Sequence, residues 1–163
     1  MRASVAASVA PVVVLGIGNS LLGDDGAGLE LLERLRAAPD WSAAIEWVDG
    51  GTLGLALLGV IEARRALLIL DAVQMGSPPG TIHVLRREEL LKLRTGGTAH
   101  ETGAIQLLNT AALLGDLPGQ FAVVGIEPAL LRTGIGLSEV VRAALPLAIA
   151  RAKSILNEFL LCV

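Results

Sequence analysis

The sequence has few aromatic residues and a single cysteine. Tyr is absent, and aromatic residues make up 2% of the 163 residues, whereas hydrophobic residues of all kinds make up 53%. The core must therefore be built mainly from aliphatic side chains. One cysteine cannot form an internal disulfide, which is typical of a reducing compartment, and we expect the protein in the cytoplasm. Cys162 is second from the end, and we interpret it as a tail residue rather than a nucleophile.

Long runs of one kind are also missing. The formal net charge is −3, and Lys and Arg form no basic stripe, which argues against nucleic acid as a partner. The sequence has no uninterrupted run of about 18 apolar residues, so we expect no membrane span. Residues 1–11 are interpreted as a disordered extension rather than a secretory signal, because their apolar residues lead directly into 12–17, which the fold needs as a strand.

Three motifs of nucleotide and ester chemistry are absent. The dinucleotide fingerprint GxGxxG requires a glycine where this chain has Leu21, and the chain has neither a Walker A sequence nor a G-x-S-x-G elbow. An ordinary α/β nucleotide-binding protein is therefore a disfavoured alternative. A hydrolytic triad of Ser20, His100 and an aspartate stays open, although no specific spacing supports it.

Short apolar runs alternate with helix-like patterns along the chain. This alternation predicts a single three-layer α/β/α domain over 1–163, with a core of 12–160 and a five-stranded, mostly parallel sheet. The connection before strand 81–85 is too short for a crossover helix, so this strand should be antiparallel to its neighbour. The predicted strands are 12–17, 44–48, 66–70, 81–85 and 121–126, and the predicted helices are 26–38, 53–63, 87–93, 103–114 and 138–159.

The predicted helix 53–63 is apolar almost all round. Thr52 precedes it and is expected to cap its N-terminus. A helix that is apolar on every face is usually buried, and we interpret 53–63 in this way. The alternative is a partly exposed surface on which a protein partner docks.

Acidic residues follow three of the predicted strands. Asp24 and Asp25 lie in the loop after 12–17, Asp49 ends the second strand and Asp71 ends the third. Because the carboxyl ends of parallel strands meet at one edge, these carboxylates should gather there, and the loop that holds His100 could reach the same edge. Clustered carboxylates repel each other unless a cation lies among them, and oxygen ligands with one imidazole suit nickel or zinc.

Simpler interpretations exist for some of these residues. Asp24 or Asp25 could be the N-cap of helix 26–38, and Asp49 could belong only to a turn. Asp71 is harder to explain in this way, because its charge lies directly at the end of a buried strand. We interpret His83, in strand 81–85, as structural.

Several motifs together resemble the maturation endopeptidases of nickel–iron hydrogenases. The resemblance runs from about residue 12 to 159 and is specific because the motifs occur in the family's order and spacing. The motifs are GIGNSLLGDDGAG (16–28), VDGGT (48–52), LLILDAV (67–73), PPGT (78–81), His100 with Gly103, VGIEP (124–128) and GIGLS (134–138).

The resemblance implies both a fold and a reaction. It implies a phosphorylase/hydrolase-like α/β fold and an endopeptidase that removes a C-terminal extension from a hydrogenase large-subunit precursor after nickel insertion. The family's metal-contacting positions correspond to Asp25, Asp71 and His100, and Asp49 matches a family aspartate that could assist catalysis, as could Asp24. Gln106 stands where some members have an acidic residue.

The resemblance leaves two roles for the metal open. The site could recognise the nickel that is already bound in the precursor, or the ion could act as a Lewis acid on the scissile carbonyl. Zinc or another divalent ion could replace nickel. The alternative function is a nickel-binding or chaperone module that cleaves nothing. We expect a monomer that docks transiently on its substrate.

Overall fold

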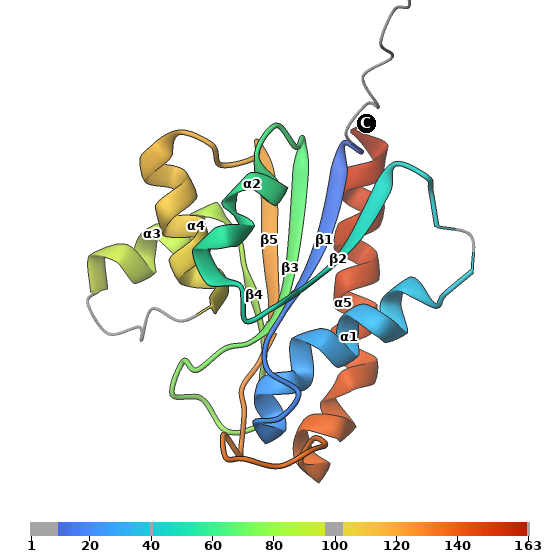
Figure 1. Ribbon diagram of the computed structural model, residues 1–163, viewed down its shortest axis with the longest axis vertical. Coiled ribbons are helices and arrows are strands. Elements are labelled where there is room, and N and C mark those ends of the chain that lie inside the picture. Colours follow the sequence, from blue (N-terminus) through green and yellow to red (C-terminus); the bar gives the residue numbers. More distant parts are fainter. Residues whose placement is uncertain (1–9, 40, 97–102, 163) are drawn as a thin grey trace, which may run out of the picture.

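The protein is described by a computed structural model that covers residues 10–39, 41–96 and 103–162. The side chains of 94–96 are not described. Figure 1 shows a sheet with helices on both sides. In chain order the elements are β1 Val12–Ile17, the 3₁₀ turn η1 Gly23–Gly26, α1 Ala27–Arg36, β2 Ile45–Gly51, the 3₁₀ turn η2 Gly54–Leu57, α2 Leu58–Ile61, β3 Ala66–Ala72, β4 Ile82–Leu85, α3 Arg87–Gly96, α4 Gly103–Leu114, β5 Gln120–Ile126 and α5 Glu139–Leu161.

The sheet has the strand order β2-β1-β3-β5-β4. The pairs β1–β2, β1–β3 and β3–β5 are parallel, and β4 is antiparallel to β5. This confirms the predicted five-stranded sheet and its antiparallel strand. A parallel sheet covered on both faces needs apolar residues on both faces of its strands, and β1 and β3 are buried along their whole length.

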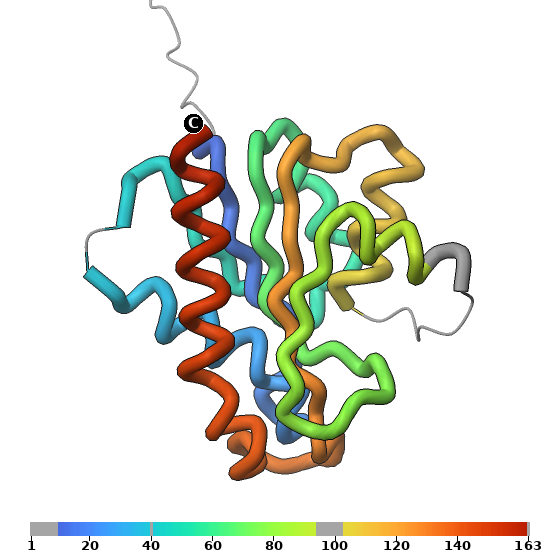
Figure 2. Tube along the Cα trace, turned by 180° about the vertical axis from the view of Figure 1, so that it is seen from behind, coloured from blue at the N-terminus to red at the C-terminus, as the bar shows by residue number. Residues whose placement is uncertain are grey.

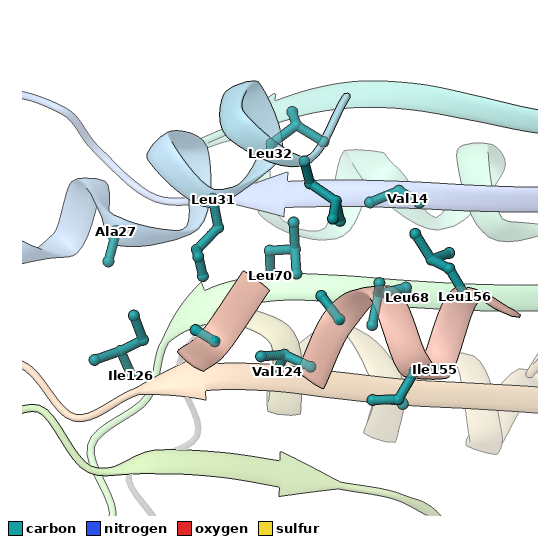
Figure 3. Packing of buried hydrophobic residues seen from close by; sticks show 14 of the residues in the cluster. Val14, Ala27, Leu31, Leu32, Leu68, Leu70, Val124, Ile126, Ile155 and Leu156 are labelled. Carbon is teal, nitrogen blue, oxygen red and sulfur yellow. The ribbon is translucent and has the colours of Figure 1, made fainter. Parts of the chain in front are cut away.

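Two aliphatic cores lie on opposite faces of the sheet. Helices α1 and α5 cover one face, where Leu31 and Leu32 of α1 and Leu156 of α5 point towards Leu68 and Leu70 of β3 (Figure 3). Residues from η2, α2, α3 and α4 form the second core. Figure 2 shows α5 running along the sheet, from the end of loop 128–138 to the C-terminus at the opposite end.

Most predicted boundaries differ from the observed ones by a few residues. The predicted strand 12–17 and helix 103–114 have the same bounds as β1 and α4. Ser138 accepts a hydrogen bond from the Val141 amide at 3.4 Å and caps α5, as expected. These elements have strong local signals, namely a continuous apolar run for β1, a glycine at the start of α4 and a capping hydroxyl for α5.

The prediction of a single buried helix at 53–63 is wrong. The segment forms the turn η2 and the short helix α2. Thr52 does not cap it, because the chain turns through Gly54 at φ +55° and Leu53 takes the capping position instead. Leu57 and Ile61 are buried, whereas Leu53 and Leu55 are 61% and 44% exposed.

Two residues of the expected N-terminal extension, Ala10 and Pro11, are described and contact the domain. Residues 1–9, which belong to the expected extension, lie outside the described residues. The carbonyl of Ala10 accepts a hydrogen bond from Arg64 at 2.8 Å, and that of Pro11 accepts bonds from the amides of Arg65 and Ala66. Within the described residues, no helix combines the length and the apolar character needed to cross a membrane.

Candidate functional site

A cavity of about 200 Å³ opens beside the first turn of α4, where β1, β2 and β3 end. These are the lower ends of the strands in Figure 1. Open α/β sheets bind ligands at this edge. Among the described residues that line the cavity, Asp25 and Asp71 are the ionisable ones. The lining consists of Ile17, Gly18, Asp25, Gly51, Thr52, Gly54, Asp71, Ala72, Gly103 and Gln106.

Asp71 is held at the mouth of β3 by two backbone amides. Its Oδ1 accepts a hydrogen bond from the amide of Ala72 at 2.8 Å, and its Oδ2 accepts one from Ala104, in the first turn of α4, at 3.0 Å. The residue is 4% exposed. Burial raises the pKa of Asp71 to about 7; the negative charge of Asp25 also raises it, and the two amides only partly offset this.

Asp25 is half-buried and closes the glycine-rich loop. Its Oδ2 accepts a hydrogen bond from the amide of Asn19 at 2.8 Å, and Asn19 Oδ1 in turn accepts one from the amide of Leu21 at 3.0 Å. The loop therefore folds around this carboxylate. A phosphate-binding loop would instead direct its amides at a ligand anion.

Two glycines let the chain pack directly against these aspartates. A Cβ on Gly18, whose φ is +142°, would lie 2.0 Å from the main-chain oxygen of Asp25. A Cβ on Gly103, whose φ is +51°, would lie 2.3 Å from Asp71 Oδ2. Only glycine adopts both the backbone angle and the close approach without strain.

Asp24 lies next to Asp25 in sequence but has a different environment. It is fully buried, and its carboxylate accepts hydrogen bonds from the amides of Ala129, Leu130 and Ser138 at 2.8, 2.8 and 2.6 Å and from the Ser138 hydroxyl at 2.8 Å. Burial alone would raise the pKa of Asp24, but these hydrogen bonds outweigh it and hold the pKa below its usual value. Asp24 is thus a structural anchor for loop 128–138 and is poorly suited to act as a base.

The N-cap interpretation of these two aspartates is wrong. Both lie in η1, and the residue that caps α1 is Gly26, which offers no side-chain hydrogen bond. The carboxylates are turned instead towards loop 128–138 and towards the cavity. The extra 3₁₀ turn before α1 separates them from the helix end.

Asp49, another predicted site residue, is not brought into the cavity. Asp49 is exposed, and its Oδ1 accepts a hydrogen bond from the amide of Gly51 at 3.0 Å, as in an Asx turn. It is not among the residues that line the cavity, although Gly51 and Thr52 on the same turn are. His100 lies outside the described residues.

Sequence reasoning missed a second buried polar centre near the site. Glu127 is 5% exposed, and its carboxylate accepts hydrogen bonds from the amides of Met75 and Gly76, at 2.9 Å and 3.2 Å, and lies 2.9 Å from His83 Nε2. This supports the structural interpretation of His83. The signal that could have revealed the centre is the acid of VGIEP, directly after a buried strand.

The neutral polar lining of the cavity was missed as well. Thr52 and Gln106 lie on the cavity wall, and both are exposed residues. Gln106 is three residues after Gly103, which places the two on one side of α4. This spacing from the glycine at the start of the helix could have indicated its position.

The structure is thus an α/β protein with a mostly parallel sheet and two aspartates in one cavity at the carboxyl edge of that sheet. Comparison with known proteins gives the family. A family model described as hydrogenase maturation protease matches residues 29–155. The chain belongs to the hydrogenase maturation protease family and is therefore a peptide-bond hydrolase.

Individual relatives support this assignment. The chain is 36% identical over 152 residues to the hydrogenase 2 maturation protease of Escherichia coli, covering 90% of this chain and 91% of that one. It is 34% identical over 151 residues to the hydrogenase expression/formation protein HoxM of Cupriavidus necator, covering 91% and 75%. The structure of the hydrogenase maturating endopeptidase HybD from E. coli superimposes with a TM-score of 0.78 at 33% identity, covering 90% of this chain and 92% of that one.

Proposed function

We propose that the protein removes the C-terminal extension of a nickel–iron hydrogenase large-subunit precursor once nickel has been inserted. Membership of the hydrogenase maturation protease family supports the class of reaction. The observation that carries the proposal is that Asp25 and Asp71 line one open cavity at the carboxyl edge of the sheet. Two carboxylates in one small cavity repel each other, and a divalent cation would offset this repulsion.

The proposed ligands are Asp25, Asp71 and His100. Asp71 is suited to a cation, because burial and the negative charge of Asp25 destabilise it as a free anion. A set of two carboxylates and one imidazole, without a thiolate, holds a metal of its own only weakly. We therefore propose that the nickel belongs to the precursor. Zinc or another divalent ion could replace it in the site.

The reaction is the addition of water across one peptide bond. The water oxygen bonds to the scissile carbonyl carbon, the carbon–nitrogen bond breaks, and a proton passes to the leaving amine. In this proposal nickel selects finished precursors and places their C-terminal segment beside the cavity. Asp49 stays a candidate for proton transfer, because the turn it begins also contributes Gly51 and Thr52 to the lining.

The partner and setting belong to the same proposal. The protein works as a cytoplasmic monomer and meets the precursor only transiently, because a single cleavage event needs no lasting complex. Sedimentation of the purified protein alone measures its oligomeric state, and sedimentation with the precursor measures whether a lasting complex forms.

The test is the mass of the precursor after incubation with the protein. We expect a nickel-loaded precursor to lose a C-terminal peptide and a nickel-free precursor to stay intact. Asp25→Ala, Asp71→Ala and His100→Ala should each abolish cleavage. Asp116→Ala is the matched control, because Asp116 is exposed on the connection between α4 and β5, and this variant should cleave like the unmodified protein.

Two outcomes would contradict the proposal. Equal cleavage of nickel-loaded and nickel-free precursors would remove the recognition role of nickel. Binding of the loaded precursor without any cleavage would favour the alternative, a nickel-binding or chaperone module that acts in hydrogenase assembly.

A further inference from the structure

The loops at the carboxyl edge of the sheet expose an unusual number of large aliphatic side chains. Half of the large apolar residues that are exposed in the described chain lie in the loops after β1, β2 and β5. At the opposite edge, the described parts of connections 37–44, 62–65 and 115–119 expose no large apolar residue, and the exposed ones there lie at helix ends, Leu113 and Leu114 of α4 and Leu161 of α5. We call the first group the edge-loop surface: Leu21, Leu53, Leu55, Leu130, Leu131 and Ile135, which are between 42% and 88% exposed.

Apart from Asp24 and Asp25 in η1, the same loops carry almost no charge. The stretches 18–23, 50–61 and 128–138 contain a single charged residue, Arg132. The connections at the opposite edge, by contrast, contain Asp40, Glu62, Arg64, Arg65 and Asp116. Exposed aliphatic side chains with few charges are typical of the centre of a protein–protein interface, where charged residues are depleted. Scattered single leucines would need no such explanation.

Part of the edge-loop surface adjoins the cavity. Leu53 and Leu55 flank Gly54, which lines it, and Leu21 belongs to the loop that contributes Gly18 and Asp25. Loop 128–138 packs against the glycine-rich loop that holds Leu21. The amide of Gly134 donates a hydrogen bond to the Leu21 carbonyl at 2.9 Å, and the amide of Asp24 donates one to the Leu130 carbonyl at 2.9 Å. The two loops lie together at one end of the molecule in Figures 1 and 2.

The buried carboxylate of Asp24 fixes the arrangement. It binds the amides of Ala129, Leu130 and Ser138, which enclose loop 128–138 at both ends. Anchoring by a buried carboxylate reduces the freedom of a loop that exposes Leu131 and Ile135. A surface ordered in advance loses less entropy when it binds a partner.

We infer that the edge-loop surface is the docking site of the folded large-subunit precursor, which rests on the proposed function. A cavity of about 200 Å³ holds only a few residues of a substrate. A specific protein complex of ordinary size buries about 800 Å² on each partner. The precursor must therefore contact the protein beyond the cavity, and the exposed aliphatic residues of the edge loops are the surface suited to it. The matching face of the precursor should be apolar and surround its C-terminal segment.

The test introduces an aspartate either into the edge-loop surface or at an exposed leucine on another part of the protein, and compares the two kinds of variant. Leu131→Asp and Ile135→Asp change the edge-loop surface. Leu113→Asp and Leu147→Asp are matched controls on α4 and α5, where these leucines are 76% and 56% exposed. With nickel-loaded precursor, we expect each edge variant to raise KM about tenfold with kcat unchanged, and the controls to behave like the unmodified protein. Circular dichroism melting checks that all four variants fold.

Binding measured separately distinguishes failure of this inference from failure of the proposed function. Biolayer interferometry reports binding of the precursor whether or not it is cleaved. Cleavage with equal KM for all variants would overturn the docking site and leave the protease function intact. Binding that the edge variants weaken, without cleavage by any variant, would support the docking site and contradict the protease function. Self-association of the protein that Ile135→Asp abolishes would assign the surface to a second copy of this chain and overturn the inference.

Discussion

Two neighbouring aspartates, Asp24 and Asp25, have opposite surroundings although no sequence pattern separates them. Asp24 is buried under four hydrogen bonds from loop 128–138, whereas Asp25 lines the cavity with Asp71. The two neighbouring aspartates therefore have two different roles. One carboxylate holds the loops, and the other is available to a ligand.

At the scale of single residues, we first predict that Asp24→Asn strongly destabilises the protein. The substitution keeps the size of the side chain but replaces one acceptor oxygen with an amide group that faces backbone donors. We expect a loss of about 2–4 kcal/mol in the free energy of unfolding, measured with urea. Asp116→Asn, at an exposed position, should change it by less than about 0.5 kcal/mol. Equal stability of the two variants would contradict the anchoring role.

We also predict that Asp71 makes the stability of the protein and its affinity for nickel depend on pH. Because the pKa of Asp71 is raised to about 7, the folded protein binds this proton more tightly than the unfolded chain does. Its contribution to the stability of the metal-free protein is thus complete below the pKa of the unfolded chain and is lost as pH rises through about 7. A divalent cation needs the ionised carboxylate, so nickel affinity should rise over the same range.

Calorimetric titration with nickel between about pH 5 and about pH 8 measures this dependence. His100→Ala should keep part of the pH dependence, since Asp71 still titrates in that variant. Asp71→Ala should lose the part of the pH dependence of nickel binding that comes from the Asp71 carboxyl group. The same pH dependence in Asp71→Ala as in the unmodified protein would show that another group controls binding.

At the scale of elements, the packing of α1 on the sheet depends on a glycine. A Cβ on Gly28 would lie 2.3 Å from the main-chain oxygens of Ile17 and Leu70 and 2.8 Å from Asp71 Cα. The close approach of α1 therefore places the glycine-rich loop and the end of β3 together. Any larger residue would separate the helix from the sheet beside the site.

We predict opposite effects for two glycine-to-alanine changes in helices. Gly28→Ala should destabilise the protein by about 1–3 kcal/mol, because the added methyl group overpacks the contact of α1 with the sheet. Gly59→Ala in α2, where nothing lies within 4 Å of the added Cβ, should stabilise it by about 0.5–1 kcal/mol. Chemical unfolding measures both. Stabilisation by Gly28→Ala would mean that α1 packs less closely than described.

At the scale of the whole molecule, one central strand links both cores. Leu68 and Leu70 of β3 face the core under α1 and α5, and Leu67 and Ile69 face the core under α4. The two faces should therefore not unfold independently. This argues for a single cooperative transition, as in most small domains.

We predict that Leu68→Ala costs about 2–5 kcal/mol and leaves the transition two-state. Trp41 and Trp47 lie with ring centroids 5.8 Å apart beside edge strand β2, so their fluorescence reports on one side of the sheet. Circular dichroism at the same denaturant concentrations reports on the helices. Separate midpoints from the two signals would show that β2 unfolds before the rest.

Local pattern was sufficient for much of the fold. Continuous apolar runs gave β1 and β3, a short connection gave the antiparallel β4, and Ser138 marked the start of α5. The acids at strand ends predicted that Asp25 and Asp71 lie together, because parallel strands all end on the same side of a sheet. The segment 53–63 was predicted wrongly, since apolar composition alone does not show which leucines find a partner.

The sequence by itself determined the layers, the glycine-rich loop and the gathering of Asp25 and Asp71, because each depends on short-range pattern and strand direction. Only the tertiary structure decided that Asp24 is an anchor, that Glu127 holds His83, and that loop 128–138 packs against the glycine-rich loop. The physical reason is separation along the chain. Asp24 and Ser138 are 114 positions apart, and a contact over that distance forms only when the whole sheet has brought its loops together.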